Sequence, residues 1–130
     1  MRNVRDSSSL YLAILGRILN GAEIGYGEQG YYLASSGDVV WDDLYDAMAR
    51  ALKTRRVVDD ESVVLADDAV LDQMGAAIQR SKEFVPVELG GLCTFTSRNG
   101  KNIGWEPEYP ADYILQAADE EVDRILNTER

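Results

Sequence analysis

The stretch Gly30–Leu52, GYYLASSGDVVWDDLYDAMARAL, decides the fold that we expect for this chain. Its opening residues, Tyr31-Tyr32-Leu33, are aromatic and bulky, which favours a short strand. The following residues, Ser35–Asp38, have the composition of a turn. Apolar side chains then recur at helical spacing and form one stripe: Trp41, Leu44, Tyr45, Met48 and Leu52. We therefore predict a strand, a turn and an amphipathic helix in direct succession.

Helical spacing marks three further segments on either side of this stretch. One helix is expected from about Ser7 to Asn20, a second is opened by Asp67 and Asp68, and a third begins at Pro110. The chain between Phe84 and Phe95 alternates only in part, so we predict irregular chain that ends in a short strand near Thr94–Thr96. The sequence thus predicts one α+β domain over residues 1–130, mostly helical, with about four helices and two or three short strands.

Length and charge exclude several classes of function. The chain has 130 residues, 45% of them apolar, and 13 basic against 23 acidic side chains give a formal charge of −10. Such a charge repels phosphate backbones and anionic lipid, so we expect no nucleic acid and no membrane among its partners. No apolar run approaches the 18 residues of a membrane span, and the start MRNVRDSSS lacks a signal-peptide pattern. We expect a soluble, cytoplasmic protein.

Two residue types that often carry chemistry are scarce. The chain has no histidine, so it lacks the usual proton shuttle near neutral pH and the commonest metal ligand. Cys93 is the single cysteine, which excludes an internal disulfide and a cysteine-rich zinc site. We interpret Cys93 as a small buried hydrophobic residue and expect no metal.

Three segments, in order along the chain, carry a family likeness. Asn3–Asp6 leads into the first helix as a "V-x-V-x-D-x-A" segment does, and Gly30–Leu44 follows the pattern "G-x-Y-x-x-x-x-G-x-x-S-W-x-x-L". Ser97-Arg98 followed by Ile103–Pro107 matches "N-S-R … L-G-W-x-P". Together they resemble the C-terminal, substrate-binding part of an extended short-chain dehydrogenase/reductase, of the NAD-dependent epimerase/dehydratase type common in fungi. The likeness covers nearly the whole chain, with Val40 and Thr96 as departures from the pattern.

The elements with which that family holds its cofactor are missing from this sequence. The nucleotide-binding half would precede residue 1, and no G-x-x-G-x-x-G follows an opening strand. The four glycines of GAEIGYGEQG fit no phosphate cradle and are interpreted as a loop. No tyrosine is followed four residues later by lysine. We therefore expect a domain that works without NAD(P) and without any other cofactor.

Several residues are candidates for binding a small molecule. The resemblance implies that Arg98 reaches a diphosphate or carboxylate of a substrate, and the alternative is a surface arginine paired with an acid. Four tyrosines are able to line a pocket or to fill the core: Tyr26, Tyr31, Tyr32 and Tyr45. Trp105 is a candidate contact for the ligand, with core packing, shared by Trp41, as the alternative.

Two carboxylates are candidates for acid–base catalysis. Glu88 lies in the apolar stretch VPVELGGL, where burial would raise its pKa, although glutamates are more often exposed. Asp38 precedes the Trp41 helix. Its neighbours Asp42 and Asp43 are better explained as anions at a helix N-terminus.

These observations leave three functional hypotheses. The first is a stand-alone, NAD(P)-independent domain that binds a small organic, natural-product-like molecule, with isomerase, cyclase or lyase activity as its catalytic form. The second is an interaction module that forms a homodimer, or complements a separate nucleotide-binding chain, through the exposed strand near Tyr31. The third is a relic or an excised piece without activity of its own. We expect a small-molecule ligand and a homodimer.

Overall fold

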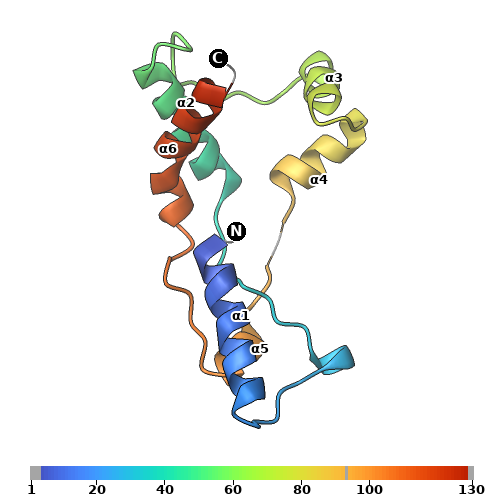
Figure 1. Cartoon of the computed structure of the whole chain (residues 1–130). Helices are drawn as coiled ribbons and strands as arrows, with labels where there is room; N and C mark the ends of the chain where they lie inside the picture. Colours follow the sequence, from blue (N-terminus) through green and yellow to red (C-terminus); the bar gives the residue numbers. More distant parts are fainter. Residues whose placement is uncertain (1–3, 93, 129–130) are drawn as a thin grey trace. The chain divides into compact units, whose positions relative to one another are not determined.

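A computed structural model describes residues 4–92 and 94–128 (Figure 1). Within these ranges the chain contains six α-helices and two 3-10 turns, and it contains no β-strand. The helices are α1 (Val4–Leu19), α2 (Trp41–Thr54), α3 (Asp68–Ala77), α4 (Val85–Gly90), α5 (Arg98–Asn102) and α6 (Tyr113–Thr128), and the turns are η1 (Gly27–Gln29) and η2 (Lys82–Phe84). The first of two compact units comprises residues 1–39 and 94–117, and the second comprises residues 40–93 and 118–130.

The prediction of an α+β fold is wrong, because the regular secondary structure of the described residues consists of helices alone. All four predicted helices are present as α1, α2, α3 and α6. Two short helices were not foreseen. Pro86 lies in the first turn of α4, where its missing N–H costs nothing, and it supports a helix in a segment that we expected to be irregular. Asn99 and Gly100 lie within the five-residue helix α5.

The predicted strand at Tyr31–Leu33 is extended chain with no backbone ladder. The side-chain amide of Asn99 donates hydrogen bonds to the carbonyl oxygens of Gln29 and Tyr31, at 3.1 and 2.9 Å. A strand exists only when a neighbouring backbone supplies such donors in a regular series. Here one amide side chain takes the place of that neighbour, so no strand forms.

The second predicted strand, near Thr94–Thr96, is absent for the same reason. The hydroxyl of Ser35 donates to the carbonyl oxygen of Phe95 at 2.7 Å. Together with the bonds from Asn99 to Gln29 and Tyr31, this contact connects residues 29–35 with residues 95–99. They are joined by side chains rather than by backbone hydrogen bonds.

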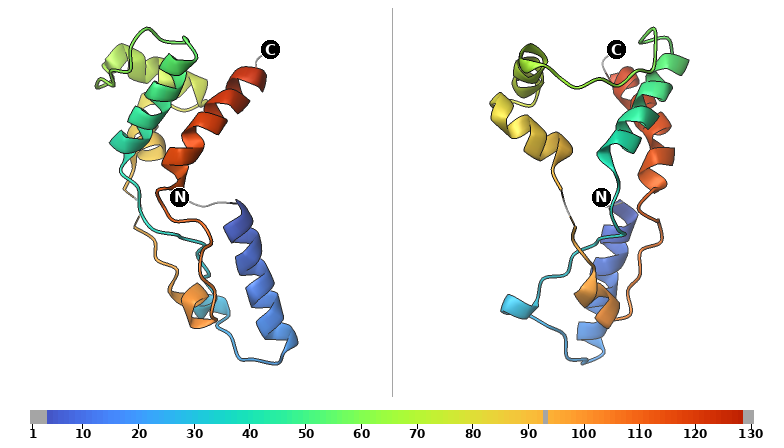
Figure 2. Two further views of the ribbon diagram at one scale, coloured as in Figure 1. Left: turned by 90° about the vertical axis from the view of Figure 1, so that its left-hand side faces the viewer. Right: turned by 180° about the vertical axis from the view of Figure 1, so that it is seen from behind.

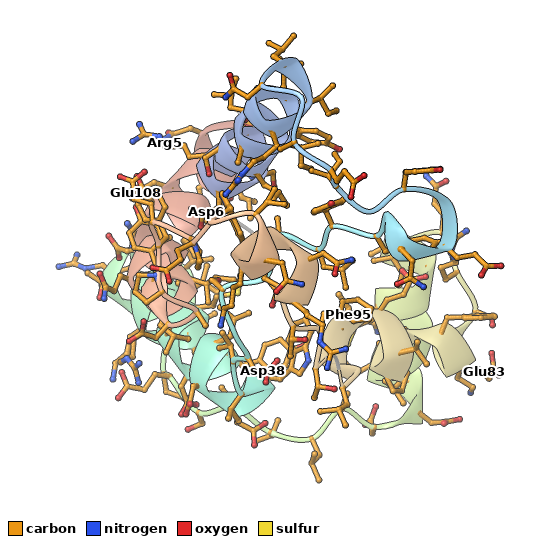
Figure 3. The ribbon with its side chains drawn as sticks, turned by 90° about the horizontal axis from the view of Figure 1, so that it is seen from below. Arg5, Asp6, Asp38, Glu83, Phe95 and Glu108 are labelled. Carbon is orange, nitrogen blue, oxygen red and sulfur yellow. The ribbon has the colours of Figure 1, made fainter. Side chains whose placement is uncertain are left out.

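The first unit is organised around Trp105, which is 4% exposed. Its indole N–H donates to the hydroxyl of Ser9 at 2.8 Å, which satisfies the polar atom of a buried ring. Gly100 leaves the space for that ring, because a Cβ at this position would lie 2.8 Å from it. Asp6 is buried in the first turns of α1 and accepts a hydrogen bond from the backbone N–H of Glu108 at 2.8 Å (Figure 3). The start of α1 is thereby fixed to residues 105–108.

In the second unit an arginine links α2 and α6, which lie side by side (Figure 2). The guanidinium group of Arg55 lies 2.7 Å from a carboxylate oxygen of Asp119 and 2.5 Å from one of Asp123. It also donates to the carbonyl oxygen of Ala51 at 2.9 Å. These hydrogen bonds raise the pKa of Arg55 and lower the pKa values of Asp119 and Asp123. A planar fork of five donors suits this double carboxylate contact better than an ammonium group would.

The N-terminus of α3 has a side-chain cap, whereas the N-terminus of α2 has none. Asp67 caps the N-terminus of α3 by accepting a hydrogen bond from the N–H of Val70 at 2.9 Å, whereas Val40 at the N-cap of α2 offers no such acceptor. After these helices, Arg56 and Gln79 adopt positive φ angles of 57° and 56°. This left-handed conformation usually falls to glycine at the end of a helix.

Replacing Val40 by serine should stabilise the second unit by about 1 kcal/mol, because the hydroxyl would accept from a free N–H in the first turn of α2. The backbone of Val40 is already extended (φ −78°, ψ 129°), as an N-cap requires. Urea unfolding of the wild type and of Val40→Ser measures the difference. Val40→Ala is the matched control, since it removes the same apolar side chain without adding an acceptor. Equal stability of the serine and alanine variants would contradict the prediction.

The Arg55 cluster should make the stability of the second unit depend on pH. The pKa values of Asp119 and Asp123 are lower in the folded chain than in the unfolded chain, so the cluster stabilises the fold above roughly pH 4, the ordinary aspartate pKa. That stabilisation is lost as the pH falls through the lowered values. The difference in melting temperature between the wild type and Arg55→Met should therefore narrow between pH 6 and pH 3.

The control for this experiment is Arg124→Met, which removes an exposed pair with Glu121 three residues away on the same helix. Exposed pairs contribute little, so this variant should follow the wild type at every pH. A difference in melting temperature between the wild type and Arg55→Met that stays constant from pH 6 to pH 3 would contradict this prediction.

Candidate functional site

A hollow of about 530 Å³ lies in the first unit, between α1 and the chain that runs from Ile24 to Ala34. Four of the residues that line it are tyrosines: Tyr11, Tyr26, Tyr31 and Tyr32. Apolar side chains from both walls complete the lining: Leu10, Ile14, Ile24 and Leu33. Such a concave surface, mostly apolar with a few hydroxyl groups, is typical of small-molecule sites.

Glycines shape the wall opposite α1. A Cβ at Gly25 would lie 2.3 Å from the carbonyl oxygen of Gln29, and a Cβ at Gly30 would lie 2.7 Å from the Cα of Tyr26. Only glycine allows the backbone to fold back so closely on itself. The segment between them forms the 3-10 turn η1. The hydroxyl of Tyr32 donates to the carbonyl oxygen of Gly25 at 3.3 Å and thus braces this turn.

The chemistry of the hollow is neutral. Among the described residues that line it, none has a charged side chain. The polar groups available to a ligand are tyrosine hydroxyls, the hydroxyl of Ser7 and the backbone. The rings of Tyr26 and Tyr31 are 87% and 73% exposed, so most of their surface is open to contact with another molecule. The arrangement is suited to stacking and hydrogen bonding.

Three of the four predicted tyrosines, Tyr26, Tyr31 and Tyr32, therefore lie at one hollow. The fourth, Tyr45, belongs to the second unit and has a structural contact. Its ring stacks on Trp41 with 5.9 Å between centroids, and its hydroxyl donates to the carbonyl oxygen of Leu89. Burial raises the pKa of Tyr45.

The remaining predicted site residues do not line the hollow. Arg98 is exposed at the first residue of α5, and Trp105 is buried in the core of its unit. Asp38 is exposed beyond the end of the lining segment. Glu88 is exposed on α4 and pairs with Arg80 at 3.1 Å, so the burial considered for it in the sequence analysis does not occur. Cys93 lies outside the described residues.

The contribution of α1 to the hollow was not predicted from the sequence. Ser7, Tyr11 and Ile14 project from one face of that helix into the lining. Their spacing of four and three residues was a usable signal, because residues so placed share a helix face. What the sequence did not show is that the glycine-rich loop returns to this face.

The described residues contain neither a metal-binding cluster nor a membrane-spanning helix. Among residues 4–92 and 94–128, no group of three or more histidine, cysteine, aspartate or glutamate side chains is placed to hold a metal ion. In the same ranges no helix is long and apolar enough to cross a membrane.

Comparison with known proteins gives no match. The chain matches no protein family model, no curated protein and no solved structure. The resemblance to the extended short-chain dehydrogenases thus stays a prediction from the three segments that carry it.

Proposed function

We propose that this protein binds a small, uncharged organic molecule with a flat aromatic or conjugated part in the tyrosine-lined hollow. The observation that carries the proposal is the gathering of Tyr11, Tyr26, Tyr31 and Tyr32 on one concave, uncharged surface. Aromatic rings contribute binding energy by offset stacking and edge-to-face contact, and tyrosine hydroxyls orient a ligand by hydrogen bonding. An anionic ligand fits less well, because Arg98 is not part of the lining.

The proposal is limited to binding and does not include a reaction. The isomerase, cyclase or lyase chemistry expected from the sequence needs a proton-transfer group whose pKa lies near the working pH. Neither of the predicted acids, Glu88 and Asp38, lines the hollow. The family resemblance favours the same site, since the segment Gly30–Leu44 that carries it begins at the wall of the hollow. Under that resemblance the ligand would bind without NAD(P).

A matched pair of probes tests the proposal. The protein should bind 2-naphthol, which is neutral at pH 7, more tightly than 2-naphthoate, an anion of similar size, because the hollow holds no cation. Tyr31→Ala should weaken 2-naphthol binding about three- to tenfold, the loss expected for one aromatic contact. Isothermal titration calorimetry measures both effects. Phe84→Ala, which removes a 54% exposed ring from η2 in the other unit, is the control variant and should bind as the wild type does.

If Tyr31→Ala and Phe84→Ala bind 2-naphthol equally, the hollow is not the binding site. Tighter binding of 2-naphthoate than of 2-naphthol would contradict a neutral ligand.

A second observation supports self-association. Several large apolar side chains are more than two-thirds exposed: Leu12, Leu19, Val64, Leu65 and Leu92. Exposed apolar side chains in such number indicate a surface that a partner covers. We propose that the protein is a homodimer. The strand edge that first suggested this is absent, so the dimer rests on the exposed apolar side chains instead.

Light scattering tests the homodimer directly. Between about 1 and 100 µM the mass should approach twice 14.4 kDa, with a fraction of dimer that rises with concentration by mass action. A mass of one chain at the highest concentration would contradict self-association.

A further inference from the structure

Helix α1 has a second apolar face that its own unit does not cover. Leu10 on one side of the helix is buried at 3% exposure, whereas Leu12, Leu15 and Leu19 are 68%, 49% and 76% exposed. These three leucines are spaced by three and four residues and form a single stripe along the helix, which we name the outer stripe. An exposed apolar stripe of this kind marks a contact surface.

Gly16 lies within the outer stripe, one turn after Leu12 and one turn before Leu19. Glycine is among the least favourable residues in the interior of a helix. The packing of the chain gives no reason for it, since a Cβ at Gly16 would meet no atom within 4 Å. By contrast, Gly25 and Gly30 at the hollow and Gly100 at Trp105 each leave space for a neighbouring atom. A second helix that crosses α1 at Gly16 would use the space that this residue leaves open.

The distribution of charge favours a second copy of this chain as the partner that covers the outer stripe. The whole chain carries a formal charge of −10, so two copies repel each other over most of their surface. Between residues 4 and 22 the only acidic residue is Asp6, which is buried. The cations of this segment, Arg5 and Arg17, donate to Tyr109 and to the carbonyl oxygen of Ile103. Helix α1 itself thus presents no exposed carboxylate to a second copy.

We propose that two copies of the protein pair through the outer stripe of α1, antiparallel and crossing at Gly16. This inference rests on the proposed homodimer and assigns its interface. A two-fold axis near Gly16 would place Leu12 of one copy against Leu19 of the other, as the self-complementary contact of a symmetric dimer requires. Tyr26, Tyr31 and Tyr32 are not part of the stripe, so ligand binding and dimer formation are separately measurable.

The decisive variant is Gly16→Ala, because its effects on folding and on pairing have opposite signs. Alanine favours helix, so circular dichroism should show equal or greater helix content and a higher melting temperature for the monomer at low concentration. In the dimer the added methyl groups would separate the helices, and the dissociation constant measured by sedimentation equilibrium should rise at least about tenfold. Leu15→Lys should raise it further. Leu65→Lys, which places the same charge on a 99% exposed residue of the second unit, should leave it unchanged.

Two results would overturn the assignment. If the wild type dimerises but Gly16→Ala pairs as tightly and Leu15→Lys behaves like Leu65→Lys, the interface lies elsewhere and only the homodimer stands. If the wild type is a monomer at every concentration, the proposed homodimer and its proposed interface are both wrong. Neither result bears on 2-naphthol binding, which is measured on its own.

Discussion

The fixing of α1 to the segment at Trp105 is the constraint on which the first unit depends. The indole ring occupies space that Gly100 leaves open, its N–H is satisfied by Ser9, and Asp6 accepts from the backbone of Glu108. A helix of 16 residues with apolar side chains on two faces has no intrinsic preference for which face it buries. The contacts at Trp105 and Asp6 determine which face of α1 is buried. They turn Leu10 inward, place Tyr11 at the hollow and leave the outer stripe exposed.

The helices were predictable because their signals are local. Apolar spacing identified α1, α2, α3 and α6, and Asp67 caps the helix that it was expected to open. The strands failed because a strand depends on a partner that is distant in sequence. Nothing in Tyr31–Leu33 indicates that Asn99, 68 residues away, will bond its backbone with a side chain instead. Pro86 illustrates the converse, since a residue that often breaks structure here lies where a helix tolerates it.

The site was predictable only in part, for a related reason. Tyr26, Tyr31 and Tyr32 are close in sequence, so their meeting at one hollow follows from a single loop. Tyr11 comes from a different element, and its contribution depends on how the glycine-rich segment folds back, which is set by close backbone contacts at Gly25 and Gly30. Tyr45 is also a tyrosine, but its ring stacks on Trp41 and its hydroxyl donates to the carbonyl oxygen of Leu89. Residue type alone does not separate these roles.

The left-handed residues that follow α2 and α3 have a consequence for engineering. Arg56 and Gln79 hold a conformation that costs an ordinary side chain about 1 kcal/mol or more and costs glycine almost nothing. The chain therefore retains reserves of stability at two helix ends that belong neither to the tyrosine hollow nor to α1. A sturdier version, suited to crystallisation, is accessible by relieving those two turns while the surfaces of interest stay as they are.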